Sequence, residues 1–308
     1  MKLTRYPRPT RTATIAIASA AAGIALAVPG LAVATHTGQD VPAPPANPTS
    51  ASQIQNIDQV KTAIKGYYGD TTTTVNDPVP NGADTSFPGD SATVPLHQFN
   101  PDGAYAHETE GIASQAGHYL ARQAHKKHHG KKAILFDIDD TTLNTYSYEI
   151  YSNFVYNPTT NAYFVNSGLP VADGGAGYAH PTDVFPGVPG MADLENKAAA
   201  KGYTVFFLTG RPSTQLDGTL LNLRDAGYTF DDHNVVLKDL TAPWLQPCQT
   251  DSNNTPCTTT EYKSLTRKHI EQDLGYDIVA NFGDQYSDLN GGFADRTFKL
   301  PNPMYFIG

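Results

Sequence analysis

Four aspartates in this chain form two pairs, and each pair directly follows a short apolar run. Asp137 and Asp139 are two positions apart, and Asp284 and Asp288 are four positions apart. Carboxylates in such pairs can provide a nucleophile and an acid for phosphoryl transfer, together with oxygen ligands for a hard cation such as Mg²⁺. Either pair alone is more typical of a capped turn or a solvated loop. The chemistry therefore depends on what accompanies them.

Two further groups of polar residues suit a phosphate. Thr209, Gly210 and Arg211 follow another apolar run. A hydroxyl beside glycine lets backbone N–H groups approach a phosphate closely, although an ordinary strand-to-helix turn has the same composition. Lys263 falls in the expected first turn of a helix over 259–274, where the macrodipole favours acids. This placement suggests a task for Lys263, with a solvated lysine as an equal alternative.

The apolar and helical patterns predict the elements that must hold these residues. Short apolar runs predict buried strands at 133–136, 203–208, 234–237 and 276–282. Helical patterns lie over 191–201, 213–226 and 259–274. Buried strands alternating with helices predict an α/β fold with a doubly wound parallel sheet, in which ligands bind at the carboxyl ends of the strands. The candidate residues follow these strands in order, and that coincidence indicates a single site.

The same residues resemble the motifs of the haloacid dehalogenase (HAD) superfamily of phosphohydrolases. Residues 137–141 (DIDDT) match its DxDx[TV] first motif, Thr209 matches the second, and Lys263 resembles the third. Residues 283–288 (GDQYSD) match the GDxxxD form of the fourth. The acid two positions after the nucleophile favours phosphate esters over the dehalogenase chemistry of the same fold.

Within that superfamily, the chain is most similar to the secreted acid phosphatases of the class B/C and plant vegetative-storage type. The segments FLTGR at 207–211 and YKSxxR at 262–267 are shared. One departure is that Leu143 and Asn144 are adjacent, which loosens the match to the family's FDxD(E/D)TxLxN pattern. The likeness extends from residue 105 to the C-terminus. It implies a HAD-like, Rossmann-like fold with a small cap insertion after the first strand.

The resemblance also implies a role for each matching residue. Asp137 would attack phosphorus and ligate Mg²⁺, and Asp139 would protonate the leaving oxygen and then activate water. Thr209 and Lys263 would hold the phosphoryl oxygens. The remaining predicted metal ligands are Asp139, Asp284 and Asp288, and the remaining predicted substrate contacts are Gly210 and Arg211. Lys238 is a rival for Lys263, but it lacks the YKSxxR context.

The expected cap over 145–185 is rich in aromatic residues. They are Tyr146, Tyr148, Tyr151, Phe154, Tyr156, Tyr163, Phe164 and Tyr178. We interpret at least half of them as the core of the cap itself. The others would form a mouth that packs against an aryl or nucleoside leaving group.

The N-terminal segment predicts export. Residues 1–34 combine a basic start, an Ala-rich apolar run and an Ala-Val-Ala exit, which are the features of a signal peptide cleaved near Ala34. The chain then divides into a flexible Pro- and Ala-rich leader (35–52), an N-terminal helix and long loop (53–104) and a catalytic domain (105–308). Further expectations are a helix over 53–68, an irregular connection over 69–103 and a second helix over 105–129.

Charge narrows the range of partners. Cleavage after residue 34 removes four basic residues and no acids, and so lowers the net charge from −9 to −13. A strongly acidic surface disfavours binding to a nucleic-acid polymer or to anionic lipid. After the signal peptide no run is apolar enough to span a bilayer, so stable membrane association is not expected. The expected partner is a small phosphate monoester, and the sequence does not predict an oligomeric state.

Two smaller features have structural explanations. Cys248 and Cys257 lie close together in a polar stretch, which in an exported protein predicts one disulfide, because a zinc site would need further ligands. The basic tract over 125–132 (HKKHHGKK) is interpreted as a solvated helix end rather than a metal site.

Together these inferences predict a secreted, Mg²⁺-dependent acid phosphatase that forms an aspartyl-phosphate on Asp137. An optimum below neutrality is expected, because like charges on Asp137 and Asp139 raise the pKa of one carboxyl. A rate that rises steadily from pH 5 to 9 would contradict it. The alternatives are a non-catalytic storage or binding protein on the same fold, a dedicated nucleotidase, and a phosphotransferase. The presence of Asp137 disfavours the first of these.

Overall fold

The computed structural model describes residues 44–80, 93–249 and 256–307. The predicted signal peptide (1–34) and the first part of the predicted leader lie outside these residues. Over the described ranges, no helix combines the length and the apolar composition needed to cross a membrane.

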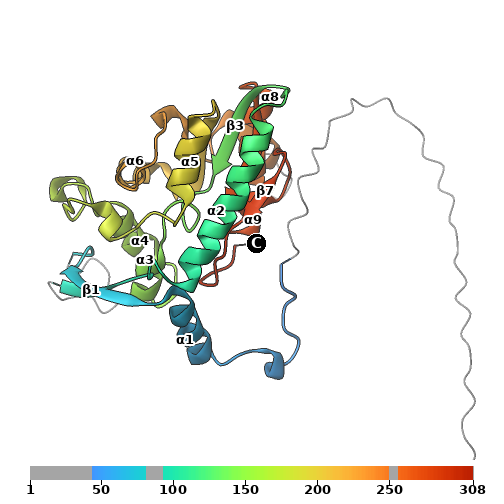
Figure 1. Cartoon of the computed structure of the whole chain (residues 1–308). Coiled ribbons are helices and arrows are strands. Elements are labelled where there is room, and N and C mark those ends of the chain that lie inside the picture. The colour runs from blue at the N-terminus through green and yellow to red at the C-terminus, as the bar shows by residue number, and fades with distance from the viewer. Residues whose placement is uncertain (1–43, 81–92, 250–255, 308) are drawn as a thin grey trace, which may run out of the picture. The chain divides into compact units, whose positions relative to one another are not determined.

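Five parallel strands form the central sheet, in the order β5-β4-β3-β6-β7. Figure 1 labels two of them, β3 and β7. The five strands are β3 Lys131–Phe136, β4 Thr204–Pro212, β5 Val235–Lys238, β6 Tyr276–Gly283 and β7 Thr297–Lys299. The first four are the predicted apolar runs. The last escapes prediction because three residues are too few to show a pattern.

Helices cover both faces of this sheet. The covering helices are α2 Ala104–Gln123, α5 Met191–Ala199, α6 Leu216–Asp225 and α8 Thr259–Gln272. Ile134 and Phe136 of β3 belong to the core that includes side chains of α2, α5 and α6, whereas Ala133 and Leu135 belong to a second core with α8. Because successive side chains of a strand point to opposite faces, the two cores lie on opposite sides of the sheet. This confirms the doubly wound α/β prediction.

The N-terminal part of the chain shares the first core. Helix α1 (Ile57–Tyr68) begins after Asn56, whose side chain accepts a hydrogen bond from the Asp58 N–H at 2.9 Å. The helix therefore starts four residues later than predicted. Its buried residues Ile64 and Tyr68 pack in the same core as the central sheet.

The prediction of an irregular connection over 69–103 is wrong in part. Strands β1 (Thr71–Asn76) and β2 (Thr93–Gln98) pair antiparallel in a separate two-stranded sheet. The β-branched threonines of β1 favour an extended chain, and Val94 and Leu96 of β2 point inward. The scarcity of apolar residues conceals these strands from a hydrophobicity pattern.

Helix α2 ends at Gln123, six residues before its predicted end at 129. Residues 125–130 form the turn into β3, and the tract is not uniformly solvated. His128 is largely buried, with Nδ1 at 2.9 Å from an Asp277 oxygen and Nε2 at 3.0 Å from the Gln123 carbonyl oxygen. His128, Asp277 and Asp295 lie close enough to hold a cation, but both ring nitrogens of His128 already have partners. Local hydrogen bonding therefore explains this cluster.

The remaining helices are short. They are α3 Tyr146–Tyr151 and α4 Pro158–Val165 in the 145–185 insertion, α7 Gln246–Gln249 after β5, and α9 Tyr286–Leu289 after β6. A disulfide joins Cys248 of α7 to Cys257, and both residues are buried in the core beneath α8.

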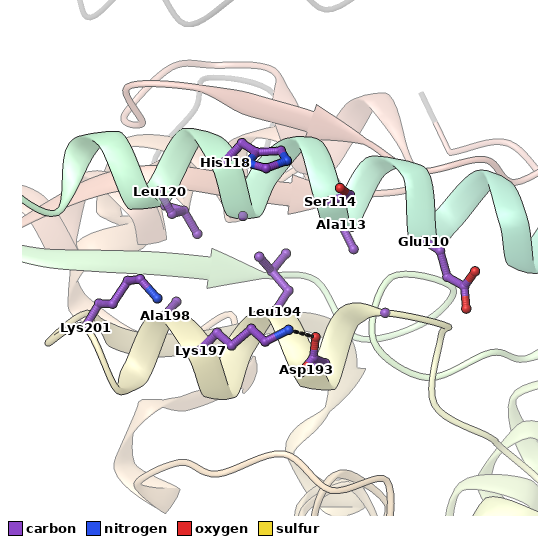
Figure 2. A pocket seen from close by; sticks show the side chains of 12 residues that line it. Glu110, Ala113, Ser114, His118, Leu120, Asp193, Leu194, Lys197, Ala198 and Lys201 are labelled. Atoms are coloured by element: carbon purple, nitrogen blue, oxygen red, sulfur yellow. Dashed lines mark hydrogen bonds and ion pairs between the residues drawn. The ribbon is translucent and has the colours of Figure 1, made fainter.

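A cavity of about 600 Å³ lies between α2 and α5. Figure 2 shows small and apolar side chains such as Ala113 and Leu194 along it, and the Asp193–Lys197 ion pair at its edge. None of the residues predicted for chemistry lines this cavity.

Candidate active site

The two aspartate pairs meet at the carboxyl edge of the sheet because β3 and β6 are neighbours. Phe136 pairs with Phe282, and the Asp137 N–H donates to the Phe282 carbonyl oxygen at 2.9 Å. Asp137, Asp284 and Asp288 are all buried, and one carboxylate oxygen of each lies within 4.8 Å of the others. Register between the two strands thus converts two distant sequence motifs into one acidic cluster.

Lys263 reaches this cluster from helix α8. Its Nζ is hydrogen-bonded to Asp137 Oδ1, lies 3.0 Å from Asp288 Oδ1 and donates to the Leu208 carbonyl oxygen at 2.8 Å. Its placement in the first helical turn is wrong. The helix is capped by Thr258 in a capping box, and Lys263 stands in the second turn, so the macrodipole argument does not apply.

Lys238 lines the same pocket but has a different contact. Its Nζ lies 5.9 Å from the centroid of the Tyr262 ring. Among the described residues, only Lys263 forms ion pairs with Asp137 and Asp288. The structure therefore separates the two lysines that the sequence leaves as rivals.

The acidic cluster contains more carboxyl groups than nearby cationic groups, and the pKa values of its members reflect this imbalance. Burial and the nearby Asp288 raise the pKa of Asp137 well above its usual value, and the same two causes raise the pKa of Asp284 to about 7. Burial lowers the pKa of Lys263, but Asp137 and Asp288 outweigh burial and raise it above its usual value. Lys263 forms ion pairs with two of the three buried carboxyl groups, those of Asp137 and Asp288. Carboxylate oxygens with this surplus of negative charge fit a hard divalent cation.

Asp139 occupies a different position from the other three aspartates. Its carboxylate accepts hydrogen bonds from Arg211 Nε at 3.0 and 3.1 Å and from Arg211 Nη2 at 2.6 Å. The Asp139 side chain is 28% exposed toward the pocket, whereas the Arg211 side chain is 3% exposed. The expected grouping of the Asp139 carboxylate with the metal ligands is therefore not what the structure shows. Arg211, expected to contact substrate, is committed to Asp139.

Thr209 and Gly210 line the pocket beside Arg211. The predicted strand end at 208 is too early, because β4 continues through a register shift to Pro212. Thr209 Oγ1 accepts a hydrogen bond from the Arg211 N–H at 3.1 Å. A Cβ atom at Gly210 would meet no protein atom within 4 Å, so the chain leaves this space open.

The turn after β6 depends on a close approach between Gly283 and Asp288. A Cβ atom at Gly283 would lie 2.4 Å from the Asp288 Cβ, which is closer than real atoms approach. Arg267, fully buried in α8, donates to the carbonyl oxygens of Asp288 at 2.5 Å, Gly292 at 2.8 Å and Asn290. The arginine of the YKSxxR segment thus fixes the backbone that carries Asp288.

Several residues around the site are not found by the sequence motifs. Asn302 and Gln285 donate to Asp284 Oδ2 at 2.7 and 2.6 Å. The Tyr305 hydroxyl donates to Asp140 Oδ2 at 2.9 Å. Asn302 and Tyr305 come from the irregular C-terminal segment, where no periodic pattern signals their approach.

The pocket around these groups has a volume of about 440 Å³ and an aromatic wall. From the insertion come Tyr148, Phe154 and Tyr156, and from the C-terminal segment come Tyr305, Phe306 and Ile307. Other insertion aromatics, such as Tyr146 and Phe164, are fully buried in the core. The aromatic residues are therefore divided between the core and the mouth of the pocket.

Comparison with known proteins places this site in context. The family model described as HAD superfamily, subfamily IIIB (acid phosphatase), matches residues 97–308, more than half of the chain. Acid phosphatase 1 of Solanum lycopersicum is 31% identical over 207 residues, covering 66% of this chain and 69% of that protein. The stem 28 kDa glycoprotein of Glycine max is 32% identical over 209 residues, covering 66% and 70%. Vegetative storage protein 2 of Arabidopsis thaliana is 29% identical over 206 residues, covering 66% of each.

Solved structures are similar as well. The class C acid phosphatase from Bacillus anthracis aligns with a TM-score of 0.46 and 20% sequence identity, covering 65% of this chain and 80% of that chain.

Proposed function

The chain belongs to subfamily IIIB of the HAD superfamily, the acid phosphatases, and from that membership we propose that it is a secreted, Mg²⁺-dependent phosphatase that hydrolyses small phosphate monoesters through an aspartyl-phosphate on Asp137. One observation carries this proposal above the others. Asp137, Asp284, Asp288 and Lys263 converge on one pocket at the carboxyl edge of the sheet.

Asp137 is the proposed nucleophile. Its carboxylate is buried at the end of the central strand and hydrogen-bonded to Lys263. A carboxylate oxygen attacks phosphorus, the P–O bond to the alcohol breaks, and the aspartyl-phosphate forms. Lys263, Thr209 and the backbone N–H of Gly210 are the proposed donors to the phosphoryl oxygens, and their shared position in the lining of the pocket supports this assignment.

Asp139 is the proposed general acid and base. It lines the same pocket, and its side chain is the more exposed partner of the pair with Arg211. Asp139 gives a proton to the departing alcohol oxygen and then takes a proton from the water that attacks the aspartyl-phosphate. Arg211 holds the carboxyl group through two nitrogens, which fixes its orientation during both steps.

Mg²⁺ would be held by Asp137 and Asp284, with Asp288 beside them. The buried carboxylate oxygens of these residues are ligands of the kind that Mg²⁺, a hard cation, prefers. When bound, Mg²⁺ would neutralise negative charge on the phosphate and on the carboxylates. Asp139 is the least suited of the four predicted ligands, because Arg211 already occupies its carboxylate.

We also propose that the mature protein is exported. Support comes from the signal-peptide features of residues 1–34 and from the Cys248–Cys257 disulfide, which suits an oxidising compartment. The proposed mature chain then consists of the leader (35–52), an N-terminal segment (53–104) that contains α1, β1 and β2, and the catalytic domain (105–308).

Hydrolysis of p-nitrophenyl phosphate tests the function. The mature protein is assayed at pH 5 to 6 with Mg²⁺, with EDTA, and as Asp137→Asn. Asp173→Asn, a matched change at an exposed residue, is the control. We expect turnover that requires Mg²⁺ and Asp137 and that Asp173→Asn retains.

Folded protein without turnover, across metals and pH, would instead favour a storage or binding role. The names of some relatives, such as vegetative storage protein 2, make that the second candidate. A dedicated nucleotidase would show itself in a substrate screen, and a phosphotransferase in competition between added alcohols and water.

A further inference from the structure

Glu149 stands apart from the other acids in the pocket. Five acids line it, namely Asp137, Asp139, Glu149, Asp284 and Asp288. Four of them have an ion pair or a side-chain hydrogen bond. Across the described ranges of the chain, the Glu149 carboxyl group has neither. Neither Glu149 oxygen is among the fully buried, unsatisfied atoms of the described residues, so the carboxyl group is open to the pocket that it lines. A carboxyl group that faces a pocket without a protein partner is a candidate for binding something outside the protein.

The position of Glu149 relates it to the leaving group. It lies on α3, within the insertion, and is only 7% exposed. Glu149 and the proposed proton donor Asp139 line the same pocket. Glu149 enters it from the insertion, whereas Thr209 and Lys263, the residues proposed to hold the phosphoryl group, come from β4 and α8. We therefore place Glu149 on the side of the leaving alcohol.

The insertion contributes three aromatic residues to the pocket, together with the polar residues Thr145 and Asn161. The three are Tyr148, Phe154 and Tyr156, and Phe306 lines the same pocket from the C-terminal segment. Aromatic faces accept apolar surface but do not discriminate between an alkyl chain and a hydroxylated one. A single buried carboxyl group can make that distinction, because a site built to hydrogen-bond a hydroxyl rejects the analogue that lacks it.

We propose that Glu149 is a specificity-determining residue that hydrogen-bonds a hydroxyl group of the leaving alcohol, so that the enzyme prefers phosphate monoesters of polyols and sugars. The inference rests on the proposed phosphatase function of the same site. A hydroxyl suits this carboxyl group in either protonation state, because it both donates and accepts hydrogen bonds. Burial, together with the nearby charge of Asp139, raises the pKa of Glu149 to about 8. A neutral carboxyl group can also donate to the alcohol.

The test compares two three-carbon esters that differ in their hydroxyl groups. The ratio of kcat/KM for glycerol 3-phosphate to that for propyl phosphate is measured with the mature wild-type protein, with Glu149→Met and with Glu149→Gln. Methionine preserves the length of the side chain without a hydrogen-bonding carboxyl group, whereas glutamine keeps the hydrogen bonding. Glu110→Met, at an exposed position on α2, is the control.

We expect the wild-type ratio to be about 10 or more, which corresponds to about 1.4 kcal/mol. Glu149→Met should bring the ratio close to one, mainly through a higher KM for glycerol 3-phosphate. Glu149→Gln should restore most of the preference, and the control should keep it. A purely structural role would slow both esters alike and leave the ratio unchanged.

Three results would overturn the proposal. The first is a ratio near one in the wild-type protein. This result needs no variant, so it tests the proposal even if Glu149→Met does not fold. The second is an unchanged ratio in an active Glu149→Met protein. Loss of hydrolysis of every ester by the wild type, p-nitrophenyl phosphate included, would overturn the proposed function and this inference with it.

Discussion

Arg211 holds the carboxylate of Asp139 with two of its nitrogens, while its third nitrogen, Nη1, donates to Thr219 Oγ1 at 3.0 Å. The guanidinium is thus anchored in helix α6 on one side and presents Asp139 to the pocket on the other. A planar fork of donors is suited to fixing the orientation of a carboxylate. This pair links the second predicted motif to the first through a contact between side chains.

Arg211→Lys should impair catalysis. Lysine keeps the positive charge but cannot donate to Asp139 and Thr219 in the same fixed geometry. A misplaced acid slows protonation of the leaving group, so we expect kcat to fall roughly 10- to 100-fold. Steady-state kinetics with p-nitrophenyl phosphate measure this. Arg224→Lys, which changes an exposed arginine paired with Asp232, is the matched control, and equal effects in the two variants would contradict the assignment.

Gly283→Ala should weaken Mg²⁺ binding, because it displaces the Asp288 side chain. The new Cβ would overlap the Asp288 side chain, which must then move away from Lys263. Displaced support of a metal site typically costs 10- to 100-fold in affinity, so the Mg²⁺ concentration for half-maximal activity should rise by about that factor. Gly111→Ala in α2, where a Cβ meets no atom within 4 Å, should leave it unchanged. A normal Mg²⁺ titration of Gly283→Ala would refute the packing argument.

Mg²⁺ should raise the melting temperature of the wild-type protein. A ligand that binds only the folded state stabilises it by about 2.7 kcal/mol at 100 times its Kd. Differential scanning calorimetry with Mg²⁺ and with EDTA would show the shift, and Asp284→Asn should abolish most of it. If the metal shifts both proteins equally, the cation binds elsewhere.

Glu195 provides a test of pH-dependent stability away from the active site. It is fully buried in α5, and one of its oxygens accepts a hydrogen bond from the Thr229 N–H at 3.2 Å. The other oxygen has no hydrogen-bond partner within the described part of the chain. Burial raises its pKa to about 7. Between the usual glutamate pKa and pH 7, Glu195 is therefore protonated in the folded state and deprotonated in the unfolded state. The stabilisation is complete below that usual pKa and is lost as the pH rises through about 7.

Glu195→Gln, which is neutral at every pH, should remove this dependence. We expect the melting temperature of Glu195→Gln to exceed that of the wild type increasingly from pH 5 to pH 8, measured by thermal unfolding at each pH. The exposed Glu110→Gln serves as the control. A constant difference between Glu195→Gln and the wild type over this range would show that Glu195 is not protonated in the folded protein.

Sequence patterns alone predict four strands of the central sheet, β3 to β6, and the polar residues near their carboxyl ends, whereas they do not predict β1, β2 and β7. Short apolar runs alternating with helical patterns predict buried parallel strands, and parallel strands bring their carboxyl ends to one edge. That rule places Asp137 and Asp284 together, because each directly follows a strand, and it brings Thr209, in the last four residues of β4, to the same edge. The spacing of apolar residues along the chain depends on local secondary structure, so strands and helices can be predicted from it without knowledge of the packing.

Tertiary structure decided which side chains contact one another. The sequence placed Arg211 with substrate and Asp139 among the metal ligands, whereas in the folded chain they pair with each other across 72 positions. Nor could it place Asn302 against Asp284, since the C-terminal segment has no periodic pattern. Such contacts depend on how helices and loops pack around the sheet. Only the tertiary structure shows that no described residue pairs with the Glu149 carboxyl group.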